Sequence, residues 1–227
     1  SEVNEEQLRA ELIVHARACE PDVEAALKTG ISRITVFLES ADWRLFQESR
    51  TGIDQAARLV YRSIAEITGS GRKVCFLTGD VTGADVNSLI ELCRAAVDAG
   101  ADSISLSDTA GIATPDGTRS IFLCVKSIFP DISLGAPCHN NLGLAVDNAL
   151  AAMEGGADCL HVTANGPGDG TGITPLRHLA VALKVQYGID AVNMPSVNEL
   201  LRMVSKFSGA HSPSLAVDEF DKGRASA

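Results

Sequence analysis

Residues 132–158 read ISLGAPCHNNLGLAVDNALAAMEGGAD, and this stretch contains one strand, one polar loop and one helix in that order. Its apolar start, 132–134, predicts a short β-strand, and the apolar residues of 143–154 recur with the period of a helix. Gly156 follows the last helical turn, where glycine tolerates the left-handed conformation that ends a helix. The polar residues 138–141 are therefore expected at the carboxyl end of the strand, just before the helix begins.

The same unit recurs along the chain. The sequence AAVDAGAD at 95–102 closely matches AAMEGGAD at 151–158. Apolar and β-branched runs predict six strands, at residues 12–16, 34–38, 74–77, 103–106, 132–134 and 159–163. Stretches with helical periodicity predict helices near residues 22–28, 53–67, 84–99, 115–128, 143–154, 175–187 and 196–207. This alternation is typical of parallel α/β folds, which include barrels and doubly wound sheets.

Polar and glycine-rich segments follow the predicted strands. They lie at residues 39–42, 78–80, 107–111, 138–141 and 163–166. In parallel α/β folds ligands bind at the carboxyl ends of the strands, because loops and helix N-termini meet there. We therefore expect the functional site at this edge of the sheet.

The composition excludes several classes of protein. The chain has 227 residues, 45% of them apolar and 21% charged, which is enough for one globular domain with a sizeable core. A net charge of −10 without a Lys/Arg cluster argues against nucleic acid and anionic membranes as partners. No apolar run approaches the roughly 20 residues that cross a bilayer, and the acidic N-terminus has no signal-peptide pattern. These features predict a cytoplasmic protein.

Six cysteines, at positions 19, 75, 93, 124, 138 and 159, form no C-x-x-C pair. Most lie within apolar periodic segments, which predicts reduced core thiols rather than a structural zinc site. Cys138, in the polar segment, is the one candidate for a reactive thiol. The alternative is the small buried hydrophobe that a free cysteine most often forms.

Three segments carry a family resemblance. They are GAPCHNNLGLAVDN at 135–148, TANGPG at 163–168 and SDTAGIATP at 107–115. They resemble, in that order, the His-x-His-Asn-Asp-x-Gly-x-Ala-x-x-Asn, Thr-x-Asn-Gly-x-Gly and Asp-Thr-x-Gly-x-x-x-Pro motifs of one superfamily, which comprises 2-isopropylmalate synthase, homocitrate synthase and 3-hydroxy-3-methylglutaryl-CoA lyase. The resemblance covers about residues 10 to 210. It is stronger to the synthase branch, mainly through residues 142–146 and 165–168.

The resemblance implies a TIM-type (β/α)₈ barrel with one divalent metal, Mg²⁺, Mn²⁺ or Zn²⁺, at its carboxyl face. A 2-oxo acid would chelate the metal, and acetyl-CoA would condense onto its polarised carbonyl. The metal ligands carried over are His139 and Asn165. The substrate-binding residues implied are Thr109, Thr163, Gly166 and Gly168, and the catalytic residues are Thr109 and Asp80.

The chain also departs from the family pattern. Pro137 stands where the first His of His-x-His belongs, and proline has no side-chain atom that binds a metal. Gly79 replaces an active-site acid, with Asp80 one step along, and Thr35 aligns with a histidine of the synthases. The family's Arg-Asp-Gly metal-binding turn does not occur, and residues 215–220 resemble only the start of the synthases' post-barrel region.

The predicted strands begin at the family's third strand. About six of eight strands are then present, and six strands cannot close an eight-stranded barrel. We expect residues 1–210 to form a barrel domain without its first two strands. Residues 211–227 form a C-terminal tail, which we expect to be poorly ordered from Pro213.

Each candidate residue also has a plain structural interpretation. His139 can be hydrogen-bonded within its own loop, Asn165 with Gly166 can form a turn, and Thr109 can cap a helix. Asp80 and Asp108 can replace missing metal ligands or can cap loops. The glycine-rich residues 166–172 can hold a phosphate group of an acyl-CoA or turn the chain. Structural or packing roles are predicted for His15, His161, His178, His211, Trp43 and Phe46.

Two functions remain open. The first is an acyl-CoA:2-oxo-acid condensing synthase of the isopropylmalate or homocitrate type, with a 2-oxo acid and an acyl-CoA as its small-molecule partners. The second is a non-catalytic barrel homologue that serves as a binding or assembly partner. Pro137 and Gly79 favour the second function, because truncation does not explain internal replacements. We expect this chain alone to be inactive, metal binding to be weak or absent, and a homo-oligomer or partner chain to complete the barrel.

Overall fold

The computed structural model describes residues 10–38, 46, 48–165 and 171–208. The elements in chain order are β1 (Ile13–Arg17), α2 (Glu20–Lys28), β2 (Arg33–Phe37), α4 (Arg50–Gly69), β3 (Lys73–Asp80), α5 (Val86–Asp98), β4 (Ser103–Ser107), α6 (Pro115–Ile128), β5 (Ser133–Ala136), α7 (Ala145–Glu154), β6 (Cys159–Leu160), α8 (Leu176–Ala182), a π-helical turn η1 (Leu183–Tyr187) and α9 (Met194–Ser208). Every predicted strand and helix is therefore present, and the helix predicted at 115–128 has the observed bounds.

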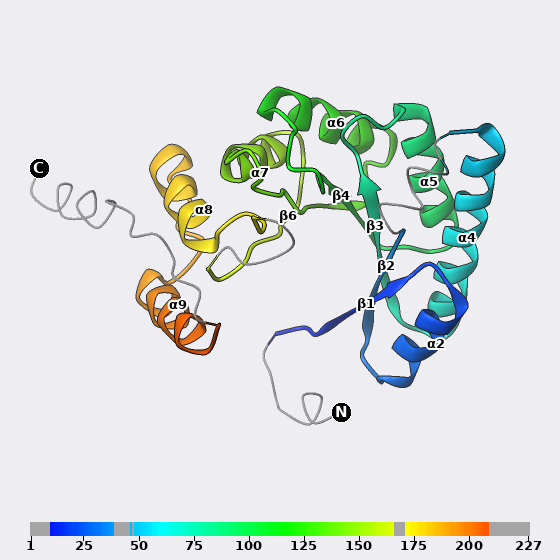
Figure 1. Cartoon of the computed structure of the whole chain (residues 1–227), viewed down its shortest axis with the longest axis horizontal. Coiled ribbons are helices and arrows are strands. Elements are labelled where there is room, and N and C mark those ends of the chain that lie inside the picture. The colour runs from blue at the N-terminus through cyan, green and yellow to red at the C-terminus, as the bar shows by residue number, and fades with distance from the viewer. Residues whose placement is uncertain (1–9, 39–45, 47, 166–170, 209–227) are drawn as a thin grey trace, which may run out of the picture.

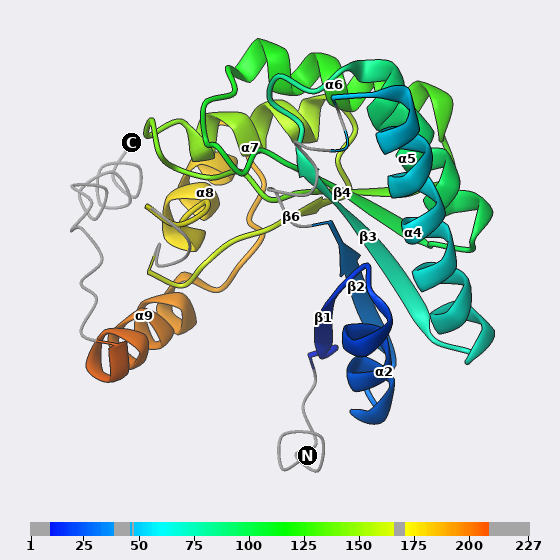
Figure 2. The same ribbon diagram turned by 45° about the vertical axis from the view of Figure 1, so that its right-hand side comes forward.

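The strands form one parallel sheet in the order β1-β2-β3-β4-β5-β6, so that each strand pairs with its neighbour in the sequence. Figures 1 and 2 show that the strands form the inner layer of an arch and that α4, α5, α6 and α7 form its outer layer. In both views the arch is open between β1 and α9. The carboxyl ends of all six strands lie at the same edge, as the sequence predicted.

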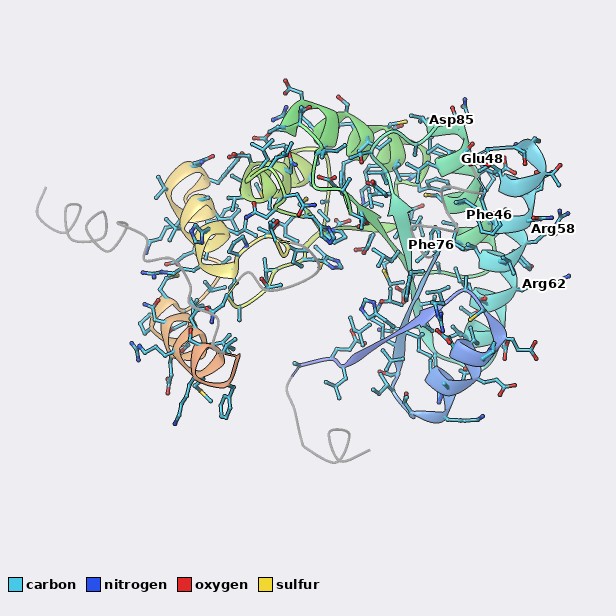
Figure 3. All side chains as sticks on the ribbon, in the orientation of Figure 1. Phe46, Glu48, Arg58, Arg62, Phe76 and Asp85 are labelled. Atoms are coloured by element: carbon cyan, nitrogen blue, oxygen red, sulfur yellow. The ribbon has the colours of Figure 1, made fainter. Side chains whose placement is uncertain are left out.

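The core lies between the sheet and the outer helices. Alternate strand residues such as Ile34, Phe76 and Ile104 are fully buried there, because successive side chains of a strand point to opposite faces. Figure 3 shows Arg58 and Arg62 extending from α4 on the side away from the sheet. The inner face of the sheet carries the other residues of each strand, and many of these are small and polar.

The repeated segments end their helices as predicted. Gly100 after α5 and Gly156 after α7 have φ values of 97° and 100°, which lie in the left-handed region that favours glycine. The repeats differ at the preceding position, Ala99 in the first and Gly155 in the second. A Cβ atom at Gly155 would lie 2.8 Å from the backbone oxygen of Arg119 in α6. The second repeat therefore needs glycine where α7 approaches α6.

Several boundaries differ from the predicted ones. β6 has two residues rather than five, and Thr163 instead forms an isolated bridge with Pro175. β3 continues to Asp80 through a register shift against β4, so Gly79 belongs to a strand and not to the loop after it. The tail at 211–227 and Trp43 lie outside the described residues, whereas Phe46 packs against the core as predicted. None of the helices in the described ranges has the length and apolar character that a bilayer span needs.

Candidate functional site

Two of the three motif segments are held together by asparagine side chains. Asn141 donates through Nδ2 to the carbonyl oxygen of Ala110 at 2.8 Å, and Asn148 donates to that of Ala113 at 2.9 Å. Segment 107–115 also approaches segment 135–148 closely. A Cβ at Gly111 would lie 2.9 Å from the backbone nitrogen of Asn141. The carboxyl ends of β4 and β5 therefore form one continuous surface.

The third motif segment joins the same surface through residues 171–175. His139 pairs with Ile173 in an antiparallel bridge, and Thr163 pairs with Pro175 in a parallel bridge. Segment 171–175 thus pairs with the residues that follow β5 and with those that follow β6. His139 lies on its β5 side and Thr163 on its β6 side. The structure brings the three motifs to one edge of the sheet.

Three predicted site residues have buried polar atoms with no hydrogen-bond partner in the described part of the chain. These atoms are His139 Nδ1, Thr163 Oγ1 and Asn165 Oδ1. The amide nitrogen of Asn165 donates to Leu201 O at 3.1 Å and to Ser205 Oγ at 3.0 Å, both in α9. A buried polar group without a partner costs free energy, on the order of 1–3 kcal/mol. Three such atoms at one edge are what a polar ligand would satisfy.

Asp108 lies just after β4 and caps the loop that follows it. Its carboxylate accepts from the backbone N–H groups of Ile112 at 3.1 Å and Ala113 at 3.2 Å, which confirms the loop-capping interpretation. Burial raises the pKa of Asp108, and the negative charge of Asp80 acts in the same direction. Burial also raises the pKa of the neighbouring Cys138 thiol to about 12. Both residues line a cavity of about 180 Å³ beneath α5 and α6.

Asp80 and Thr109, the two predicted catalytic residues, each form a hydrogen bond with a residue two positions away in the sequence. Asp80 accepts from the backbone N–H of Thr82 at 3.1 Å and from its hydroxyl at 2.7 Å. The hydroxyl of Thr109 lies 2.9 Å from that of Ser107. Thr109 does not cap a helix as one interpretation proposed, because α6 begins at Pro115 and Thr114 is its N-cap. Thr109 therefore presents a hydroxyl at the carboxyl end of β4.

The metal-binding atoms of this site are too few for the divalent metal that the family pattern implies. His139 Nδ1 and Asn165 Oδ1 supply two neutral donor atoms, and Pro137 supplies none. In the described residues no group of three His, Cys, Asp or Glu side chains could hold a metal ion. Mg²⁺-type ions usually need at least one carboxylate. The described residues by themselves therefore do not fit such an ion. Gly166 and Gly168, two predicted substrate-binding residues, lie outside the described residues.

One polar cluster was missed by the sequence analysis. Ser105 Oγ lies 3.2 Å from His161 Nε2 and 3.4 Å from Cys75 Sγ. Ser105 lies on β4, His161 directly follows β6 and Cys75 lies on β3. No motif signals this cluster, because the contact depends on Gly135, which lies between Ser105 and His161 and has no side chain.

Solved structures place the fold in the TIM-barrel class. The hydroxymethylglutaryl-CoA lyase of Bacillus subtilis superposes with a TM-score of 0.78 at 17% identity, covering 96% of this chain and 76% of the lyase. The corresponding lyase of Pseudomonas aeruginosa gives 0.74 at 19% identity, covering 96% and 77%. These likenesses confirm the predicted fold, an α/β protein of the barrel type, with six strands in the described part of the chain and an open sheet.

The amino-acid sequence identifies the family. The HMGL-like family model matches residues 1–204, and the chain belongs to this family. Homocitrate synthase of Sulfolobus acidocaldarius is 38% identical over 206 residues, covering 91% of this chain and 44% of that enzyme. Homocitrate synthase of Sulfurisphaera tokodaii is 37% identical, covering 91% and 45%. The chain therefore spans less than half the length of these relatives, and the resemblance to condensing synthases is confirmed.

Proposed function

We propose that this chain forms most of the barrel of an acyl-CoA:2-oxo-acid condensing synthase of the homocitrate or isopropylmalate type, with acetyl-CoA as the acyl donor. The observation that supports this proposal is the set of buried, unpartnered atoms of His139, Thr163 and Asn165 at the edge where the motifs meet. A 2-oxo acid carries three adjacent oxygen acceptors, which suit the hydroxyls of Thr109 and Thr163 and an N–H at His139 Nδ1. Asn165 Oδ1 is itself an acceptor, so its partner is a hydrogen-bond donor or a cation and not an oxygen of the 2-oxo acid. The identity to homocitrate synthases supports the same substrate class.

The proposed site is incomplete within the described residues. We assign substrate binding to Thr109, Thr163, Gly166 and Gly168. Gly79 stands where the family has an active-site acid, and we assign that catalytic role to Asp80, the next residue in the sequence. A divalent metal, Mg²⁺, Mn²⁺ or Zn²⁺, would need ligands beyond His139 and Asn165. We therefore expect weak or undetectable binding of these three ions in titration calorimetry. Micromolar binding that His139→Ala abolishes would contradict this expectation and would point to Asp80 or Asp108 as a further ligand.

Activity of the isolated chain tests the proposal. Free CoA thiol is measured after incubation with acetyl-CoA and pyruvate, 2-oxoisovalerate or 2-oxoglutarate, for the wild type, His139→Ala and Pro137→His. We expect no catalytic turnover by the wild type, that is, no more than one equivalent of CoA per chain, because one missing transition-state contact typically costs about 10²–10³ in rate and several are missing. Calorimetric binding of one 2-oxo acid that is weakened by His139→Ala and by Thr163→Val supports the site. Absence of binding for all three acids counts against it.

The second candidate function is a non-catalytic barrel homologue that binds a partner or assists assembly. Pro137 and Gly79 favour it, since both replace chemistry-bearing residues of the family pattern inside the chain. Turnover by the wild type that disappears in His139→Ala would exclude this second function. If all three proteins are inactive and none of the 2-oxo acids binds, the non-catalytic function is the one that remains.

A further inference from the structure

The inner face of the sheet carries a connected row of polar side chains from β3, from β4 and from the residue that follows β6. Ile104 on β4 and Leu134 on β5 point into the core beneath the helices and are fully buried. Their neighbours Ser105 and Gly135 therefore point to the inner face. Ser105 and Gly135 are also paired in the sheet register. His161 follows β6 and reaches the same face, because its Nε2 lies 3.2 Å from Ser105 Oγ.

The contact between Ser105 and His161 crosses an intervening strand. β4 and β6 are separated by β5, so the two backbones are about 10 Å apart at the usual strand spacing. Gly135 lies on β5 between them. A Cβ at Gly135 would lie 2.4 Å from Ser105 Oγ and 2.7 Å from His161 Nε2, distances that real Cβ atoms do not show. The absence of a side chain at Gly135 is thus a geometric requirement for this hydrogen bond.

Cys75 extends the row to a third strand. Its Sγ lies 3.4 Å from Ser105 Oγ, so Ser105 lies between the thiol and the imidazole. Burial lowers the pKa of His161, and the nearby His15 acts in the same direction. The imidazole is then neutral near pH 7 and can accept a proton at Nε2. The atoms therefore line up as a thiol, a hydroxyl and a base.

We propose that Cys75, Ser105 and His161 form an activated-thiol site in which Cys75 accepts the acyl group of an acyl thioester. The proton of the Cys75 thiol passes to Ser105 Oγ while the Ser105 proton passes to His161 Nε2. The resulting thiolate attacks the thioester carbonyl, the bond to the CoA sulfur breaks, and the leaving thiolate takes the proton from the imidazolium. The products are an S-acylated Cys75 and free CoA, and no oxidant or reductant is needed.

Cys75 rather than Ser105 is the nucleophile. A thiol ionises far more readily than a hydroxyl and is intrinsically more nucleophilic. Both residues are buried, and Cys75, at 8% exposure, is more exposed than Ser105, at 2%. Ser105 lies two residues before Ser107 on β4, and Ser107 bonds to Thr109 of the candidate site. The thiol cluster thus lies one layer, about 7 Å, beneath that site.

The choice of an acyl thioester rests on the proposed function, whereas the activation of Cys75 does not. The first test therefore uses iodoacetamide on the folded 227-residue chain, with the rate at each cysteine followed by mass spectrometry. We expect alkylation of Cys75 to slow at least about tenfold in Ser105→Ala and in Gly135→Ala, with the rate at Cys124 unchanged. Gly69→Ala is the matched control, since a Cβ there meets no atom within 4 Å. Equal Cys75 rates in wild type and Ser105→Ala would overturn the proposal.

The second test supplies the acyl group. The chain is incubated with acetyl-CoA and separately with the small thioester S-acetyl-N-acetylcysteamine, and the intact mass and modified peptide are measured. We expect one acetyl group on Cys75, lost in Cys75→Ser and slowed in His161→Ala. Acylation by the small thioester but not by acetyl-CoA would sustain the thiol site and count against the proposed function. If alkylation depends on Ser105 but neither thioester acylates Cys75, acyl transfer is overturned.

Discussion

Cys138 lines one cavity together with Asp108 and with residues of α6, and 2% of its surface is exposed. Its place in a polar segment made it a candidate for reactivity. Position in a sequence does not reveal burial, and burial is what raises its pKa to about 12, with the negative charge of Asp108 acting in the same direction. The structure therefore confirms the alternative, a small buried hydrophobe.

The predicted consequence is a thiol that does not react in the folded chain. At pH 8 a group with a pKa of about 12 is ionised to roughly one part in 10⁴, whereas an ordinary thiol is about one quarter ionised. We expect iodoacetamide to modify Cys138 at least about a thousandfold more slowly than Cys124 in the same sample. Denaturation with urea should bring the two rates together. Comparable rates in the folded protein would show that Cys138 is accessible and ionised.

The sequence predicts which residues lie at the ends of strands, but it does not predict contacts between side chains of different strands. His139 and Asn165 follow β5 and β6 at the edge that the sequence predicted, because parallel topology brings the carboxyl ends of strands together. Thr163 lies at the same edge but not in β6, where the sequence placed it. The contact of Ser105 with His161 was not predictable, since it joins residues 56 positions apart across a strand. It depends on the missing side chain of Gly135 and on sheet curvature, and neither leaves a periodic signal.

At the scale of elements, strand order and helix positions followed from periodicity, whereas strand ends did not. β3 was predicted to end at Leu77, because Thr78 and Gly79 are typical of loops. It continues because Asp80 pairs with Ser107 after a register shift. β6 was predicted to reach Thr163 but stops at Leu160, since Thr163 pairs with Pro175 instead. Tertiary pairing decides these ends, and local residue preference does not.

The packing of α6 on α7 depends on Gly155. A Cβ there would lie 2.7 Å from the Cβ of Phe122 and 2.8 Å from the carbonyl oxygen of Arg119. Gly155→Ala is therefore expected to lower the free energy of unfolding by about 1–3 kcal/mol, the usual cost of overpacking. Gly69→Ala at the end of α4 is the control, and we expect it to be neutral or slightly stabilising. Urea unfolding of both variants measures the difference, and equal stabilities would contradict the close approach.

A second contact between elements is sensitive to pH. Glu154 at the end of α7 accepts from Tyr187 Oη and from Arg119 Nε, the latter at 2.8 Å. The hydrogen bond from Tyr187 and then that from Arg119 lower the pKa of Glu154. A carboxyl group with a lowered folded-state pKa stabilises the fold above its unfolded pKa, and this contribution is lost as the pH falls.

We therefore expect Glu154→Gln to melt below the wild type at pH 7 and to differ less as the pH falls below the ordinary glutamate pKa of about 4.3. Melting temperatures measured between pH 3 and pH 8, by circular dichroism, test this directly. Tyr187→Phe should reproduce part of the effect, because it removes the largest cause of the shift. A difference between wild type and Glu154→Gln that stays constant across this range would contradict the assignment.

In the molecule as a whole, the sheet has two edges that no described strand of this chain pairs with. Among the described strands, β1 pairs only with β2 and β6 pairs only with β5. The chain also spans 44% of the Sulfolobus acidocaldarius homocitrate synthase that it resembles. An unpaired parallel edge presents rows of backbone donors and acceptors that another strand can pair with. A further strand at either edge would stabilise the sheet by pairing with its backbone groups and by burying exposed apolar side chains.

We expect the isolated chain to associate with itself through the β1 edge. Ile13 on β1 is 48% exposed, so a second copy that pairs with this edge would bury apolar surface as well as backbone groups. We expect a reversible dimer in sedimentation velocity at micromolar concentrations. Ile13→Lys should raise its dissociation constant at least about tenfold, because a charged side chain at an edge opposes strand pairing. Since Ile13 is exposed, the monomer's stability should change little. Tyr61→Lys on α4, which is away from the β1 edge and where Tyr61 is 46% exposed, serves as the control. A monomer at every concentration, or a dimer equally weakened by both variants, would show that the β1 edge does not drive association.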